Sequence, residues 1–231
     1  MEKPKSIVVV IPAHNEATVV GQIVARVPAE VDSIPIHTVV VDDGSQDGTA
    51  ATAFSAGAVV VRHLTNLGVG SATRTGLRAA DRWKPVVVVT IDADGQHDPA
   101  DIPRLVQPIL RENIDVVIGS RMTNPHGMPL HRIGANLLMN LVTFAVYGRI
   151  VPDSQSGFKA FSRHALESMS LSSDGYEVCS EIIGEIAVRG LSCRFVPVEA
   201  VYTEYSKAKG QHFLNGINVI LQLFGRMLRR V

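Results

Sequence analysis

The sequence lacks several features that would assign it to a specialised class of protein. It contains two cysteines, Cys179 and Cys193, whose separation fits neither a zinc site nor a disulfide framework, so we expect reduced, partly buried thiols. Lysine plus arginine and aspartate plus glutamate are equal at 22 each, so no net field favours nucleic acid as a partner. No apolar run reaches the roughly 18 to 20 residues that span a bilayer, and we expect no signal peptide in the first residues.

Two common nucleotide-binding signatures are also missing. The sequence has no GxxxxGK[ST] loop, and no GxGxxG follows its first predicted strand. What is present is a length of 231 residues, of which 46% are hydrophobic. These values are typical of one globular α/β domain and argue against disorder.

Short runs of β-branched residues alternate with amphipathic segments along most of the chain. This alternation predicts a mostly parallel, Rossmann-like sheet flanked by helices. Predicted strands cover 6–11, 36–41, 58–62, 86–91, 115–119, 157–161 and 192–198. Predicted helices cover 16–27, 46–55, 69–80, 100–111, 132–147, 163–169 and 178–189. Asn15 is the expected N-cap of the first helix. We expect one main domain over residues 1–210 and a separate helix over 211–231.

Two carboxylates stand one residue apart in the stretch from Thr90 to His97. The stretch follows the apolar run from Pro85 to Val89, so Asp92 and Asp94 lie where a buried strand ends. Ligands bind at the carboxyl ends of strands in α/β sheets. Paired carboxylates at such a place suit a hard divalent cation, which is often shared with substrate phosphates. The pattern therefore predicts an Mg²⁺ or Mn²⁺ site and a phosphate-bearing substrate.

Further polar residues follow other predicted strands at the same edge of the sheet. Asp43 adds a second acidic residue at a strand end without an obvious structural gain, so we expect it to bind ligand. Asp47 precedes a glycine and fits ordinary turn chemistry. His63 and His97 fit supporting or surface positions better than direct metal ligation.

Six motifs occur in an order and spacing that resemble the family 2 glycosyltransferases of the GT-A fold, over about residues 7–207. They are Pro12-Ala13-His14-Asn15-Glu16, Asp42-Asp43-Gly44-Ser45-Gln46-Asp47-Gly48-Thr49, Asn66-Leu67-Gly68-Val69-Gly70, Asp92-Ala93-Asp94, Gly119-Ser120-Arg121 and Ser156-Gly157-Phe158-Lys159. Within this family the motifs around Asp94 and Arg121 are most similar to those of dolichyl-phosphate mannose synthases and related polyprenyl-phosphate glucosyltransferases.

The resemblance implies roles for three groups of residues. Those around the donor nucleotide would be Pro12, His14, Glu16, Val41, Asp43 and Ala93. Those that bind the metal and the donor diphosphate would be Asp92, Asp94 and Gln96. Those that face phosphate of the donor or the acceptor would be Arg121, Arg132 and Lys207.

The chain departs from the family pattern at several positions. His14 stands where the synthases often carry tyrosine, and Gly95 where leucine is frequent. In the late motif Arg-x-x-Gly-x-Ser-Lys, Val201 replaces the arginine and Glu204 replaces the glycine. The Gln-x-x-Arg-Trp signature of processive polysaccharide synthases is absent.

The resemblance implies a metal-dependent, inverting transfer of a hexose from GDP-mannose or UDP-glucose to a polyprenyl or dolichyl phosphate. A phosphate monoester is already anionic near neutral pH and needs little deprotonation, so Arg121 and Lys207 would only have to hold it in line. The catalytic residues expected on this hypothesis are Asp94, Arg121 and Asp153, although Asp153 also fits a turn role.

Three alternatives remain open from the sequence. A transferase that acts on a glycan or a small hydroxyl acceptor would need a general base, for which the candidates are Asp153, Asp174, Glu177 and Glu181. A nucleotidyltransferase would use the same strand-end carboxylates but release pyrophosphate. A non-catalytic binding module would bind the nucleotide sugar and metal without turnover.

The last twenty residues form an amphipathic pattern with a basic end. The apolar positions at helical spacing are Phe213, Ile217, Ile220, Phe224, Met227 and Val231, and the basic ones are Arg226, Arg229 and Arg230. Two interpretations fit: a helix in the interface of an anionic membrane, or a terminal helix docked on the domain. We expect a cytoplasmic protein, peripheral at the inner face of the membrane or recruited by a membrane-anchored partner.

Overall fold

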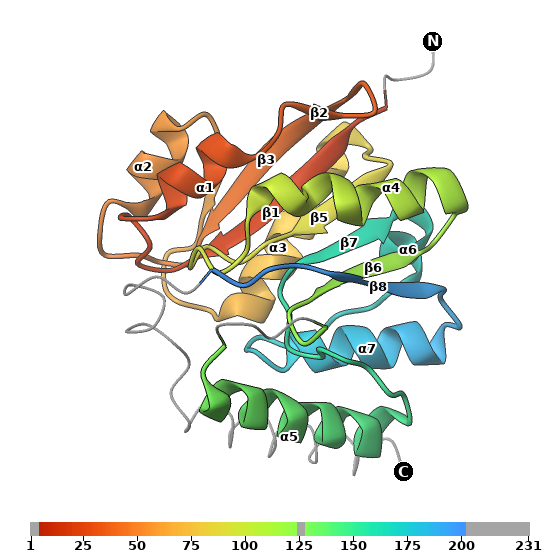
Figure 1. Cartoon of the computed structure of the whole chain (residues 1–231). Helices are drawn as coiled ribbons and strands as arrows, with labels where there is room; N and C mark the ends of the chain where they lie inside the picture. Colours follow the sequence, from red (N-terminus) through yellow and green to blue (C-terminus); the bar gives the residue numbers. More distant parts are fainter. Residues whose placement is uncertain (1–4, 124–127, 202–231) are drawn as a thin grey trace.

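The computed structural model describes residues 5–123 and 128–201, and it forms one sheet with helices on both faces (Figure 1). The strands follow one another in the order β2-β3-β1-β5-β7-β6-β8, and β4 also pairs with β3. The strands are β1 (Ile7–Ala13), β2 (Glu30–Val31), β3 (Ile34–Asp42), β4 (Val59–Arg62), β5 (Val87–Thr90), β6 (Val116–Ser120), β7 (Lys159–Ser162) and β8 (Cys193–Pro197).

The helices lie between these strands in the chain, much as the alternating pattern predicts. They are α1 (Val20–Arg26), α2 (Thr49–Ser55), α3 (Val69–Ala80), α4 (Ile102–Glu112), α5 (Leu130–Tyr147), α6 (Arg163–Ser168) and α7 (Val178–Val188), with short 3₁₀ turns η1 (Asp81–Trp83) and η2 (Pro99–Asp101). None of the helices in the described part of the chain is long and apolar enough to cross a bilayer.

The sheet is mostly parallel, as the sequence predicts, but the short edge strand β2 is antiparallel to β3, and the inserted strand β7 is antiparallel to both of its neighbours. β1 runs parallel to β3 and β5, and β6 runs parallel to β8. β7 lies between β5 and β6 and is antiparallel to both. β5 and β6 therefore point the same way, and their carboxyl ends lie at the same edge as those of β1 and β3. The start of β7 reaches that edge too, although the sequence pattern does not reveal its direction.

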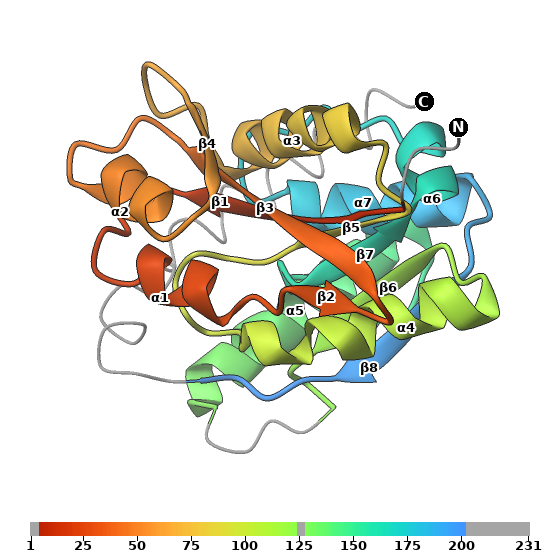
Figure 2. The same ribbon diagram turned by 90° about the horizontal axis from the view of Figure 1, so that it is seen from above.

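Both faces of the central strands are buried, which explains their continuous apolar sequence. Alternate residues of β1 face opposite helices. Ile7, Val9 and Ile11 pack in a core with α1, α2 and α4, while Val8 and Val10 pack against α3. Farther along the sheet, α6 and α7 cover the same face as α3 (Figure 2). α5 lies outside α7 and forms an additional layer (Figure 1).

Local structure differs from the sequence prediction at the first helix. α1 begins at Val20, and Val19 occupies its N-cap position, so the prediction of Asn15 as the cap is wrong. Asn15 instead has a left-handed backbone, and its backbone N–H donates to Ser45 Oγ at 2.8 Å. The loop after β1 thus binds the loop after β3 before the helix starts.

The two cysteines are free and partly buried, as expected. The predicted helix over 211–231 lies outside the described residues.

Candidate active site

The sheet edge gathers the motifs that the sequence separates. β1 lies between β3 and β5 in the sheet, so Asp43, Ala13 and Asp92 follow one another along the edge. β6 brings Arg121 to the same edge, and the residues before β7 enter between them. The sheet topology thus brings motifs that lie far apart in the sequence to one place.

The two carboxylates of the Asp-x-Asp motif destabilise each other's charge. Burial, followed by the nearby carboxylate of Asp94, raises the pKa of Asp92 to about 6. Burial also raises the pKa of Asp94, although its carboxylate accepts a hydrogen bond from the Gln96 backbone N–H at 2.9 Å. The positive charges of Lys159 and Arg121 partly offset the repulsion at Asp92. A pair of this kind is stabilised by an additional cation.

Gly157 lies in close contact with the Asp92 side chain. The carbonyl oxygen of Gly157 accepts a hydrogen bond from Thr90 Oγ1 at 2.8 Å, which fixes this segment beside the end of β5. A Cβ atom at position 157 would overlap both carboxylate oxygens of Asp92. Nearby Lys159 is buried, and its ammonium donates to the carbonyl of Ser156. In the Ser-Gly-Phe-Lys motif, the glycine therefore allows the backbone to approach Asp92 closely, and the lysine places a positive charge near it.

The donor set fits a hard divalent cation such as Mg²⁺ or Mn²⁺. Carboxylate oxygens are the ligands that such ions prefer, and Mg²⁺ often takes one or two carboxylates while keeping waters and substrate phosphates. Among the described residues, no group of three or more histidine, cysteine, aspartate or glutamate side chains forms a self-sufficient metal site. Asp92 and Asp94 would therefore need oxygens from a substrate, from water or from an amide such as that of the adjacent Gln96.

Arg121 is held beside this pair by a buried carboxylate. Its Nε and Nη2 atoms donate to the two oxygens of Asp153 at 3.0 and 3.1 Å, and its backbone N–H donates at 3.1 Å. Asn136 of α5 adds a hydrogen bond to Asp153 at 2.7 Å. Arg121 and these donors hold the pKa of Asp153 below its usual range, although burial opposes them. Asp153 is thus an ionised partner that orients Arg121, and the charge of Arg121 acts on both Asp92 and Asp94.

Asp43 uses its carboxylate to organise the loop after β4. It accepts hydrogen bonds from His63 Nδ1 at 2.7 Å and from the backbone N–H groups of Leu67 and Gly68 at 2.9 and 2.8 Å. His63 Nε2 lies 2.9 Å from Thr75 Oγ1, so both ring nitrogens have partners. Sequence reasoning expected Asp43 to bind ligand. In the structure, the Asp43 carboxylate binds groups of the protein itself, among them the His63 ring.

The other residues expected around the donor nucleotide line the ends of β1, β3 and β5. The buried ones are Pro12, Glu16, Val41 and Ala93. His14 is partly exposed, and its Nδ1 lies 2.8 Å from the backbone oxygen of Asp43. Glu16 accepts the first backbone hydrogen bonds of the turn that leads into α1. These residues are brought together with Asp92 and Asp94. Lys207 lies outside the described residues.

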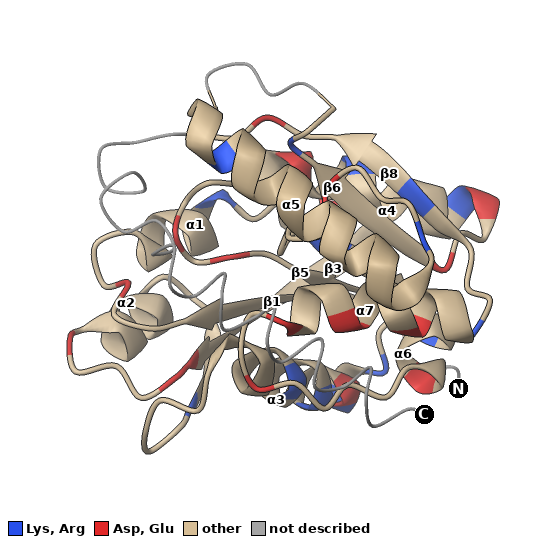
Figure 3. Cartoon of the chain, turned by 90° about the horizontal axis from the view of Figure 1, so that it is seen from below, with Lys and Arg blue, Asp and Glu red and all other residues tan. Residues whose placement is uncertain are grey.

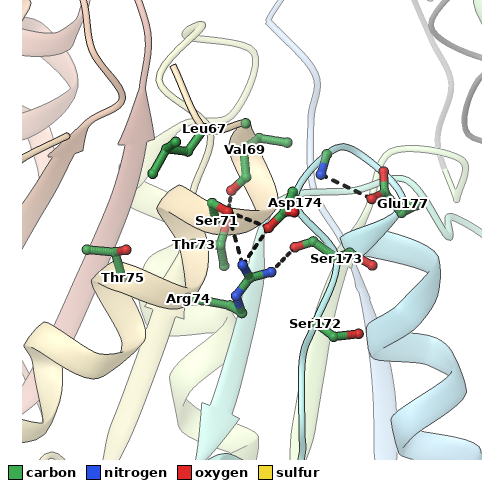
Figure 4. Close-up of polar contacts among 12 residues, drawn as sticks. Leu67, Val69, Ser71, Thr73, Arg74, Thr75, Ser172, Ser173, Asp174 and Glu177 are labelled. Carbon is green, nitrogen blue, oxygen red and sulfur yellow. Dashed lines mark hydrogen bonds and ion pairs between the residues drawn. The ribbon is translucent and has the colours of Figure 1, made fainter. Parts of the chain in front are cut away.

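A short loop before α7 crosses to the start of α3. Ser71 and Arg74 of α3 both donate to Asp174 Oδ1 at 2.6 Å, and Arg74 also donates to the carbonyl of Ser173 (Figure 4). The carbonyl of Asp174 accepts from the backbone N–H of Gly70 at 2.7 Å. A Cβ atom at Gly68 or Gly70 would overlap this loop. The glycines of the third motif are therefore explained by close approach of two segments.

The same loop engages the remaining acidic candidates for a general base. Glu181 accepts from the backbone N–H groups of Ser172 and Ser173 and from the Ser172 hydroxyl. Glu177 accepts from the Gly175 backbone N–H at 3.1 Å. With Asp174 bound to α3 and Asp153 bound to Arg121, all four candidate carboxylates serve as acceptors for groups of the protein.

Two residues near the carboxylates received no specific role from the sequence. Tyr176, which precedes α7, has its pKa raised by burial and then by Asp92 and Asp94. His97 is buried against the ring of Phe158, with 5.2 Å between ring centroids, and burial lowers its pKa to about 3. Neither ring nitrogen of His97 has a hydrogen-bond partner in the described part of the chain. The sequence predicted a supporting or surface position for His97, and the structure buries it.

Comparisons with known proteins agree with this geometry. The family model for glycosyl transferase family 2 matches residues 8–169. The chain is 36% identical to UDP-N-acetylglucosamine–dolichyl-phosphate N-acetylglucosaminyltransferase of Methanococcus voltae, over 95% of each chain. It is 31% identical to polyprenol monophosphomannose synthase of Mycolicibacterium smegmatis, over 94% of this chain and 83% of that one.

A solved structure with the same fold contains a nucleotide and a metal. The crystal structure of glucosyl-3-phosphoglycerate synthase from Mycobacterium tuberculosis in complex with Mn²⁺, uridine diphosphate and phosphoglyceric acid has a TM-score of 0.75 and 25% identity, over 98% of this chain and 78% of that one. The fold is therefore the GT-A fold that the sequence motifs imply. The sheet edge, the matched residues and the relatives together show that this chain is a glycosyltransferase and belongs to family 2.

Proposed function

We propose that the protein transfers a sugar from a nucleotide diphosphate sugar to a polyprenyl phosphate, with Mg²⁺ or Mn²⁺ at Asp92 and Asp94. The names of two relatives support the acceptor class, because one acts on dolichyl phosphate and the other is a polyprenol monophosphomannose synthase. The Mn²⁺ in the mycobacterial synthase complex supports the metal. The donor class follows from family 2 membership, and the identity of its sugar is part of the test below.

The observation that carries the proposal is the state of the acidic side chains around the site. Transfer to a hydroxyl group calls for a general base. The four carboxylates that could take this role all accept hydrogen bonds from the protein, from Arg121, Ser71, Gly175 and Ser172 among others. An acceptor that is already anionic needs no such base. Arg121 and Arg132 place positive charge near Asp94, where an anionic acceptor would be held.

Each part of the site has a task in this reaction. A bound Mg²⁺ or Mn²⁺ would neutralise charge that develops on the leaving diphosphate. Asp92 and Asp94 would hold the ion, and Gly157 keeps Asp92 in place by close contact. Arg121, oriented by Asp153, would bind the acceptor phosphate and align it with the sugar. Residues at the ends of β1 and β3 would surround the nucleotide.

A panel of donors with a polyprenyl phosphate tests the proposal directly. GDP-mannose, UDP-glucose and UDP-N-acetylglucosamine would each be incubated with the acceptor, with Mg²⁺, with Mn²⁺ and with EDTA. We expect one donor to give a lipid-linked sugar and a nucleoside diphosphate, only when metal is present. Sugar transfer to phosphoglyceric acid or to a glycan, with none to the lipid, would instead support the hydroxyl-acceptor alternative.

The products also separate the other two alternatives. A nucleotidyltransferase would release pyrophosphate and form a sugar nucleotide. A binding module would retain the donor in the presence of metal without releasing a nucleoside diphosphate on any acceptor. Either result would contradict the proposed reaction, even if donor binding depends on Asp94.

A further inference from the structure

α5 presents its polar side chains inward. Asn136 donates to Asp153, and Asn140 donates to the backbone carbonyl of Pro152 at 2.8 Å. Thr143 is buried, with its Oγ1 3.1 Å from Ser180 Oγ of α7. These contacts fix which side of the helix faces the domain. Met139 and Val142 are buried as well, so the inner side of the helix combines polar and apolar residues.

The outward side of α5 is apolar. Leu137 and Leu141 are 54% and 63% exposed, and Leu130 near the helix start is 85% exposed. We call the exposed apolar side chains of this helix the α5 outer face, which consists of Leu130, Leu137, Leu138, Leu141 and Phe144. Single exposed leucines are common on soluble proteins, whereas a run of them along one helix marks an interaction surface.

The charges on α5 and directly after its end have one sign. Arg132 is the only charged side chain of the helix apart from the titratable His131, and Arg149 follows its end. The helix contains no acidic residue, and Figure 3 shows it almost without colour except near its start. An apolar face with flanking basic residues and no carboxylates complements the interface of an anionic membrane.

The same helix reaches the candidate active site. Asn136 is on its inner side and binds the carboxylate that orients Arg121. Arg132 lies one turn earlier on the same helix. A lipid surface under the α5 outer face would therefore lie beside the arginines that are proposed to bind the acceptor phosphate.

We propose that the α5 outer face lies in the interface of an anionic membrane and presents the start of α5 to the phosphate of a membrane-embedded acceptor. The identity of that acceptor rests on the proposed function, but the membrane contact does not. The contact belongs to the catalytic domain itself and is distinct from the amphipathic pattern predicted over residues 211–231.

Vesicle binding by the full chain tests this contact without any reaction. The test variant is Leu137→Glu with Leu141→Glu. The matched control is Phe54→Glu with Leu64→Glu, since these side chains are also strongly exposed but belong to α2 and to the loop after β4. The vesicles contain phosphatidylcholine, with or without phosphatidylglycerol, and no polyprenyl phosphate. We expect the test variant to lower the bound fraction on anionic vesicles by at least about tenfold and the control to change it less than about twofold.

Several results would overturn the membrane contact. They are equal vesicle binding by the test variant and the parent chain, or no binding by the parent chain. Light scattering that shows a parental dimer and a variant monomer would assign the face to a second copy instead. A lower free energy of unfolding for the test variant without vesicles would show that another part of this chain, such as residues 202–231, covers it.

A second measurement separates this inference from the proposed function. Both variants should transfer sugar to a short, water-soluble prenyl phosphate at the parental rate, and only the test variant should fail with a long acceptor in vesicles. If the parent chain transfers sugar to neither acceptor, the proposed function fails while the vesicle-binding result stands. If the test variant keeps its rate with the long acceptor in vesicles, α5 does not deliver the acceptor.

Discussion

The carboxylates on the two sides of the site are in opposite electrostatic states. On the side where we propose that the donor binds, Asp92 and Asp94 lie together in a partly buried place, and burial raises the pKa of both. On the side where we propose that the acceptor binds, Asp153 is fully buried, yet Arg121 lowers its pKa. A ligand with positive charge would stabilise the ionised Asp92 and Asp94, whereas Asp153 already has Arg121 as its counter-ion. The comparison shows that burial alone does not decide the pKa of a carboxylate, because the bonded Arg121 outweighs burial at Asp153, whereas more distant positive charges do not outweigh it at Asp92.

The largest expected effect is the loss of the donor-side charge. Asp94→Asn should lower the rate of sugar transfer by about 10³-fold or more, because metal stabilisation of a transferring group is worth several kcal/mol. It should also abolish metal-dependent donor binding, measured by calorimetry with the nucleotide sugar and Mn²⁺. Asp32→Asn is the control, since Asp32 pairs with Arg111 at the opposite end of the sheet. Unchanged donor binding by Asp94→Asn in the presence of metal would refute the metal site.

On the acceptor side, Asp153→Asn should act mainly on stability. It leaves the buried Arg121 charge without its counter-ion, which costs about 3 kcal/mol in the free energy of unfolding. Transfer should weaken through a higher KM for the acceptor, because Arg121 loses its orientation. The measurements are denaturant unfolding and acceptor kinetics. A variant that unfolds like the parent but loses kcat, with a changed pH profile, would instead identify Asp153 as a general base.

Gly157→Ala tests whether close approach fixes the donor-side pair. Its methyl group would overlap the Asp92 carboxylate, so the carboxylate or the backbone must move. We expect transfer to fall by about 10²-fold, since displacement of a reacting group by about 1 Å has this effect. Gly134→Ala is the matched control, because nothing lies near its Cβ position. Equal activity of the two variants would show that the contact at Gly157 is not needed.

Asp92→Asn should stabilise the metal-free chain while it removes activity. The pKa of Asp92 is higher in the folded protein than the ordinary 3.8, so its ionisation reduces stability as pH rises from about 4 to about 6. In EDTA at pH 7 the variant should gain up to about 3 kcal/mol over the parent, from a shift of about two units at 1.36 kcal/mol each. Thermal unfolding against pH measures this. If the stability of the parent chain does not change over that pH range, the raised pKa of Asp92 is contradicted.

The smallest effect is expected at the loop before α7. Asp174→Asn should reduce the free energy of unfolding by less than about 1 kcal/mol, because its ion pair with Arg74 is largely solvated. Its backbone carbonyl, which the substitution leaves in place, still accepts from Gly70. Transfer should change by less than about threefold. Near-complete loss of transfer would make Asp174 a catalytic residue and favour a hydroxyl acceptor.

Much of the fold was predictable because its signals are local. The 3.6-residue pattern gave α3 over Val69–Ala80, as found, and the apolar run before Asp92 identified β5 as a buried strand. The order of motifs gave the family. The first helix was misplaced because Asn15 resembles a cap, whereas its backbone and side chain join the loops after β1 and β3. Those contacts join residues 30 and 31 positions apart in the chain and leave no local pattern.

The sequence by itself determined the alternation of strands and helices, the Asp-x-Asp motif at a strand end and membership of a family. These depend on residue type and spacing along the chain. Only the tertiary structure decided which carboxylates lie close to each other and which are paired with a cation, because Arg121 and Asn136 reach Asp153 across 32 and 17 positions of the chain. It also decided that α5 points its asparagines inward and its leucines outward. The period of a helix fixes which residues share a face, but packing fixes which face meets the protein.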